Sequence, residues 1–135
     1  MKWPNGSHVS QVRIARPTSR LKEVVAFYKD GLGLLQISSF ENHAGYSGVM
    51  LGLPDKSYHL EFTQHEGGSP CPAPTKDNLL VLYLPEKKDV VRLAAQLRKL
   101  GHAPVPPENP YWNAKGLTFE DPDGWRVVLM ETPGI

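Results

Sequence analysis

This 135-residue chain has little cysteine, no excess of either charge and no long apolar run. Its one cysteine, Cys71, cannot form a disulfide within the chain. Cys71 also lies in a Pro-rich stretch with no predicted base beside it, which disfavours a role as a nucleophile. The cysteine content is typical of a cytoplasmic protein.

The charge balance and the hydropathy exclude two classes of partner. There are 15 basic and 14 acidic residues, with a formal net charge of +1, and no dense basic run. Such a chain offers no electrostatic surface for nucleic acid or for an anionic membrane. The N-terminal residues lack the apolar stretch of a signal peptide, and no apolar run is long enough to cross a bilayer. We therefore predict an unprocessed, soluble protein with no nucleic-acid or membrane partner.

The most informative pattern in the sequence is a hairpin that occurs twice. Residues 119–131 read as a strand, a tight turn at Asp121-Pro122-Asp123-Gly124 and a second strand. About half a chain earlier, residues 48–55 lead into residues 58–62 in the same way. The outgoing strand carries Glu61 in the first copy and Val128 at the matching place in the second.

The duplication extends backward from both hairpins. A strand at residues 12–15 and a helix at 21–28 correspond to a strand at 79–84 and a helix at 90–100. Two copies of so long a pattern indicate a duplicated module, because a solenoid needs at least three repeats. We predict one α+β domain over residues 1–135, with module one at about 8–65, a Gly- and Pro-rich linker at about 66–77 and module two at about 78–132.

Both helices show an apolar stripe at helical spacing. The first has Thr18 or Ser19 available as N-cap and Gly31 or Gly33 available to end it. The second ends at Gly101. The stripes consist of Leu21, Val24, Val25 and Tyr28 in the first helix and Val90, Leu93, Ala94, Leu97 and Leu100 in the second.

The strands alternate between an apolar face and a mixed face. The apolar parity should pack against the helices, while the mixed parity is typical of a cavity that binds a ligand. A further pair of aromatics, Tyr111 and Trp112, lies in a polar segment and either covers the core edge or contacts a ligand. The mixed parity includes Arg13, Ala15, His59, Glu61, Thr63, Val81, Tyr83, Arg126, Val128 and Met130.

Three motifs together resemble the vicinal oxygen chelate superfamily, which includes glyoxalase I, extradiol dioxygenases and bleomycin-resistance proteins. They are the two β-α-β-β-β modules, the segment at residues 27–34 and the Asp-Pro-Asp-Gly turn at 121–124. The resemblance covers nearly the whole chain and implies two sheets paired around a cavity, with the helices on the outer face. It also implies a homodimer, because members of the family complete their cavities from two chains.

The resemblance further implies four metal-ligand positions, on the first and last strands of each module. These positions hold Arg13, Glu61, Leu79 or its neighbour, and Val128. A guanidinium has no lone pair to donate to a cation, and the last two side chains are hydrocarbon. One carboxylate falls short of what a catalytic Zn²⁺ or an octahedral metal requires from the protein.

Two histidines could replace missing ligands. His8 is too far from the first helix in sequence and is expected to be exposed, while His59 shares a strand face with Glu61. We expect a cavity hydrogen bond for His59. Arg13 and Glu61 could form a buried ion pair in the metal's place, or an ordinary surface pair.

Three functions remain open. The first is a metal-free protein that binds a small organic molecule. The second is a metal-dependent lyase or dioxygenase that uses Zn, Ni, Mn or Fe with Glu61 and His59. The third is a cofactorless enzyme with Glu61 as general base and Arg13 as oxyanion stabiliser. The missing ligands favour the first, with a predicted cavity of Arg13, His59, Glu61, Tyr83, Trp112 and Val128.

Overall fold

The computed structural model describes residues 5–53, 57–69 and 72–135. The predicted turn at Pro54-Asp55 and Cys71 lie outside these ranges. The chain divides into two compact units, Met1–Cys71 and Pro72–Ile135, which are described separately. The two sheets and their helices form a mixed α+β fold, which confirms the predicted class.

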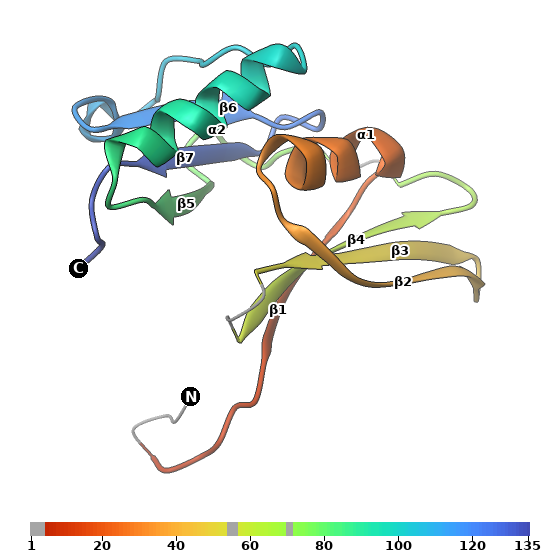
Figure 1. The fold of residues 1–135 in the computed structure, drawn as a ribbon. Helices are drawn as coiled ribbons and strands as arrows, with labels where there is room; N and C mark the ends of the chain where they lie inside the picture. Colours follow the sequence, from red (N-terminus) through yellow and green to blue (C-terminus); the bar gives the residue numbers. More distant parts are fainter. Residues whose placement is uncertain (1–4, 54–56, 70–71) are drawn as a thin grey trace. The chain divides into compact units, whose positions relative to one another are not determined.

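The first unit contains a four-stranded sheet in the order β1-β4-β3-β2 (Figure 1). Strand β1 is parallel to β4, and the other neighbours are antiparallel. One short helix lies on one side of this sheet (Figure 1). The elements are β1 Val12–Pro17, α1 Leu21–Val25, η1 Ala26–Gly31, β2 Leu35–His43, β3 Tyr46–Gly52 and β4 Tyr58–His65, in the predicted order β-α-β-β-β.

The first helix ends near the predicted glycines, but its second half is a π-helix. The amide of Leu32 donates to the carbonyl of Phe27 at 3.0 Å, a bond that spans five residues. Two adjacent aromatics of this turn, Phe27 and Tyr28, lie in the core, and the Tyr28 ring stacks on Phe62 at 4.8 Å between centroids. The stripe predicted from the sequence included Tyr28 and left out Phe27, which lies three residues after the buried Val24 and so shares its face.

The predicted N-caps of this helix are wrong. The Thr18 hydroxyl accepts from the Arg20 amide at 2.9 Å, and the Ser19 hydroxyl accepts from the Ser69 amide at 2.7 Å. The free amide of Leu21 donates instead to the side-chain oxygen of Gln64, at 2.8 Å. A strand residue therefore caps the helix from 43 positions away.

The second unit has a three-stranded sheet in the order β5-β7-β6, with one face covered by its long helix (Figure 1). The place of a fourth strand is taken by a single bridge between Val105 and Thr118. Residues 104–110 contain four prolines, which lack the amide hydrogens that a ladder needs. The elements are β5 Leu79–Tyr83, α2 Lys87–Lys99, η2 Pro110–Asn113, β6 Gly116–Glu120 and β7 Arg126–Met130.

Strand β7 is buried on both faces, so the alternation of its side chains does not distinguish a core-facing side from a cavity-facing side. The turn before it matches the prediction: a side-chain oxygen of Asp121 accepts from the amides of Asp123 at 2.8 Å and Trp125 at 3.0 Å. Gly124 has a φ of +88°, a conformation that favours glycine. Ile14, which lies on the apolar parity of β1 that was predicted to pack against the helices, is 41% exposed because β1 is an edge strand.

Candidate functional site

Three predicted residues meet on the side of the first sheet that faces away from α1. In the register of β1 and β4, Arg13 lies opposite His59, and Ala15 lies opposite Glu61. Cross-strand partners share a face, whereas successive residues alternate. Gln64, which holds α1, therefore belongs to the opposite face from Glu61. The parity argument from the sequence placed these three side chains correctly.

The Arg13 guanidinium contacts both of the other side chains. Its Nε donates to His59 Nε2 at 2.8 Å, and its Nη1 lies 3.3 Å from Glu61 Oε2. We call these three residues the Arg13 cluster. A cation that can only donate hydrogen bonds thus engages the two side chains with the best metal-binding chemistry on this face.

The Arg13 cluster is sheltered on one side and open on the other. His59 is 4% exposed and the Glu61 side chain 12%, but the Arg13 side chain is 46% exposed. The pair is therefore neither the fully buried pair nor the ordinary surface pair considered from the sequence. The carboxylate is held in place, and the guanidinium keeps a face that solvent or a ligand can reach.

The hydrogen bond from Arg13 also determines which histidine nitrogen carries a proton. Guanidinium has no acceptor atom, so His59 Nε2 must accept and the ring proton of the neutral form lies on Nδ1. Within the described ranges, Nδ1 is buried and has no hydrogen-bond partner. The Arg13 cluster therefore contains a sheltered N–H donor, His59 Nδ1–H, that makes no hydrogen bond to the described residues.

The residues of this face do not fit a divalent metal. Arg13 stands at the first-strand position of the first unit; the corresponding positions of the second unit, described separately, hold Leu79 and Val128, which offer no donor atom. In the part of the chain that the structure describes, no group of three or more His, Cys, Asp or Glu side chains could hold a metal ion. His8 is exposed, as expected. No step of chemistry is therefore assigned to a metal.

The predicted site residues of the second unit are more scattered. Tyr83 is 46% exposed and packs near Gly134. Trp112 lies in η2, where its ring meets Tyr111 edge-on at 5.0 Å. Val128 has no exposed surface. These positions do not form one site within the second unit, and a cavity shared by the two sheets stays a prediction.

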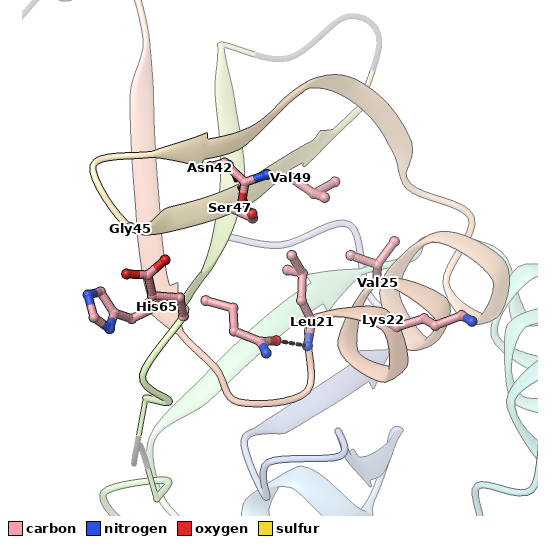
Figure 2. Close-up of a pocket in the computed structure, with 10 residues that line it drawn as sticks. Leu21, Lys22, Val25, Asn42, Gly45, Ser47, Val49 and His65 are labelled. Atoms are coloured by element: carbon pink, nitrogen blue, oxygen red, sulfur yellow. Dashed lines mark hydrogen bonds between the residues drawn. The ribbon is translucent and has the colours of Figure 1, made fainter.

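A pocket of about 510 Å³ lies between α1 and the β2–β3 hairpin (Figure 2). It is on the helix side of the sheet, because Val49 pairs with Phe62 while its neighbour Met50 pairs with Glu61. No pattern in the sequence predicted this pocket. Its lining residues come from α1, from the hairpin and from the end of β4, and a local alternation pattern does not reveal how such distant segments pack.

The chain matches two family descriptions in tandem: the YycE-like N-terminal domain over residues 12–63 and the YycE-like C-terminal domain over residues 77–131. It is 52% identical over 126 residues to the uncharacterized protein YycE of Bacillus subtilis, covering 93% of this chain and 91% of that protein. A crystal structure of a YycE protein of unknown function from Bacillus subtilis covers 100% of this chain and 98% of its own, with 48% identity and a TM-score of 0.94.

More distant structures share the fold. Glyoxalase I of Leishmania major has a TM-score of 0.72 at 19% identity, covering 93% of this chain and 88% of its own. TnmS3, an antibiotic binding protein from Streptomyces, has a TM-score of 0.63 at 21% identity, covering 92% and 94%. The chain belongs to the YycE-like family, and it shares its fold with glyoxalase I and with an antibiotic binding protein.

Proposed function

We propose that this protein binds a small organic molecule and does so without a catalytic metal. The observation that carries the proposal is the Arg13 guanidinium, which bonds His59 at 2.8 Å and lies 3.3 Å from Glu61. A cation built into the protein repels a second cation and occupies the donors that such an ion would need. The half-exposed guanidinium and the sheltered carboxylate instead suit recognition of a polar group on a ligand.

The metal-free character is tested by elemental analysis of purified, tag-free protein together with thermal unfolding. We expect well under one equivalent of metal, and no rise in Tm with Zn²⁺, Ni²⁺, Mn²⁺ or Fe²⁺. An ion that binds the native state would raise Tm by mass action. One equivalent of tightly held ion would overturn the proposal.

A variant makes this test sharper. Arg13→His removes the built-in cation and places a third metal-ligating side chain beside His59 and Glu61. Catalytic zinc sites have three protein ligands. We expect Zn²⁺ to raise the Tm of this variant. The matched Arg13→Gln variant also loses the charge but gains no imidazole, so its Tm should respond much less.

Ligand binding is tested with benzoate, and with benzyl alcohol as an uncharged probe of similar shape. The open face of the Arg13 guanidinium favours the carboxylate, because charge-assisted hydrogen bonds are the stronger ones. We expect benzoate to shift the NMR signals of Arg13 Nε and the His59 ring, and Arg13→Met to abolish the shifts in His59. No response of the Arg13 cluster to either probe would count against binding there.

TnmS3, described as an antibiotic binding protein, supports the choice of a binding function through its shared fold. A metal-dependent lyase or dioxygenase would instead contain about one equivalent of metal, and the added ion would raise its Tm. A cofactorless enzyme with Glu61 as base stays a second hypothesis. Such an enzyme would use Glu61 Oε1 as the base, because Oε2 lies 3.3 Å from Arg13 Nη1.

We also propose a cytoplasmic homodimer. The sheet of the first unit exposes large apolar side chains at Leu35, Ile37 and Tyr46, with exposed fractions of 53%, 54% and 44%. Apolar surface of this kind marks interaction sites. Among the described residues, no helix is long and apolar enough to cross a membrane.

A further inference from the structure

We propose that the pocket between α1 and the β2–β3 hairpin is a second binding site, which takes a small molecule with an apolar chain and a primary ammonium group. It lies on the opposite face of the sheet from the Arg13 cluster and does not depend on the function proposed there. Its volume of about 510 Å³ falls within the range of roughly 300–1,000 Å³ that small-molecule pockets occupy.

The middle of the pocket is apolar. Figure 2 shows Leu21 and Val25 of α1 directed toward Val49 of β3. Leu21 and Val25 are one helical turn apart and so lie on the same side of α1. All three side chains are only partly buried, in contrast to the neighbouring core residue Val24, which has no exposed surface. They therefore offer an apolar wall that a ligand can cover.

The hairpin that forms the opposite wall is held in a bent shape. Asn42 and Ala44 have φ angles of 50° and 51°, a left-handed conformation that non-glycine residues adopt at a cost. The Asn42 amide donates to the Ser47 hydroxyl oxygen at 3.3 Å, which ties the two sides of the turn together. Asn42 and Ser47, one on each strand of the hairpin, both line the pocket on the side that faces α1.

The hairpin end of the pocket carries a carboxylate. Glu66 lines the pocket, and its backbone amide donates to the Gly45 carbonyl at 2.8 Å. Its Oε1 would lie 3.5 Å from a β-carbon placed on Gly45, so the side chain reaches over the turn. In the described part of the chain this carboxylate has no ion-pair partner. An ammonium group at this end would supply one.

The lysine that lines the pocket lies in the wrong place to bind an anionic head group of a ligand whose chain covers the apolar wall. Lys22 extends along α1, away from Ser47 and Val49 (Figure 2). An anionic group that met the Lys22 ammonium would draw the ligand off the apolar wall. A chain that covers Leu21 and Val49 reaches the hairpin end instead, and this favours a cationic head group over an anionic one.

The test compares hexylamine, hexanol and hexanoate, which share one chain length and differ in head-group charge. Each is titrated into the full chain, with the methyl signals of Leu21, Val25 and Val49 followed by NMR. We expect saturable shifts with hexylamine, a Kd about three- to tenfold weaker for hexanol, and weaker binding still for hexanoate. Equal affinity for the three probes, or tightest binding of hexanoate, would overturn the proposal.

Variants test the contributions of the carboxylate and of the apolar wall to binding separately. Glu66→Gln should weaken hexylamine about three- to tenfold and leave hexanol unchanged, while Lys22→Gln is the matched control and should change neither. Val49→Phe should fill the pocket and remove binding of both probes. If Val49→Phe fails to fold, the Glu66→Gln result decides alone: an unchanged Kd for hexylamine would refute the assigned role of Glu66.

Discussion

Among single residues, the arginine–glutamate pairs Arg13–Glu61 and Arg126–Glu120 differ in burial. In the first unit Arg13 is half exposed and Glu61 sheltered. In the second unit the Arg126 side chain is 5% exposed and Glu120 is 39% exposed, with Nε and Oε2 3.1 Å apart. Arg126 also donates to the Pro106 carbonyl at 2.8 Å. If the glutamate is removed, Arg13 can be hydrated, whereas Arg126 stays buried in protein.

We expect Glu61→Ala to lower the free energy of unfolding by about 1–2 kcal/mol. This lies between the values of under about 1 kcal/mol for exposed pairs and roughly 3–5 kcal/mol for buried ones, because the Arg13 left behind can be hydrated. Urea denaturation measures the loss. Arg13→Met combined with Glu61→Gln should recover part of it, and a loss above about 3 kcal/mol would mean that the pair is fully buried in solution.

Glu120→Ala should cost more, about 2–4 kcal/mol, because it leaves the buried Arg126 guanidinium with only the Pro106 carbonyl as a described partner. The same urea series applies. Arg92→Gln is the control, since the Arg92–Asp89 pair at 2.9 Å involves an arginine side chain that is 71% exposed, and its loss should be under about 1 kcal/mol. A smaller loss for Glu120→Ala than for Glu61→Ala would contradict this ranking.

At the scale of elements, α1 depends on the sheet for its start. It has only five α-helical residues before the π-helical turn, and its N-cap residue Arg20 makes no capping hydrogen bond through its side chain. Such a short helix is not stable alone. The side-chain oxygen of Gln64 satisfies the Leu21 amide and joins the helix to β4.

We expect Gln64→Leu to destabilise the first unit by about 1 kcal/mol, the usual loss when a helix cap is removed. Hydrogen exchange should show faster exchange of the Leu21 amide, since its acceptor is gone. Gln64→Glu keeps an acceptor oxygen and is the control that should preserve protection. Unchanged exchange at Leu21 in Gln64→Leu would show that the cap is unimportant.

At the scale of the whole molecule, the exposed apolar side chains of β2 motivate the homodimer. Sedimentation equilibrium at micromolar protein should give about 30 kDa, which is twice the chain mass of 15.0 kDa. A single species of about 15 kDa would contradict the dimer and would also remove a cavity shared between chains. Ile37→Lys, on the exposed part of β2, should shift the equilibrium toward monomer.

Much of the fold and part of the Arg13 cluster followed from short-range patterns. The strand period of two placed Arg13, His59 and Glu61 on one face, because alternation is a property of the backbone itself. The turn at Asp121 was equally local, since its side chain bonds amides two and four residues ahead. The long helix α2 ended just before Gly101, which has a φ of +96°.

The features that join distant segments of the chain depend on tertiary packing. These are the cap from Gln64 to Leu21, the Arg126–Pro106 bond, the burial of both faces of β7 and the pocket behind the bent hairpin. Sequence periodicity reports which way a side chain points and says nothing of what covers it. Burial, hydrogen-bond partners and pocket walls depend on packing between elements, and packing forms only when the whole chain folds.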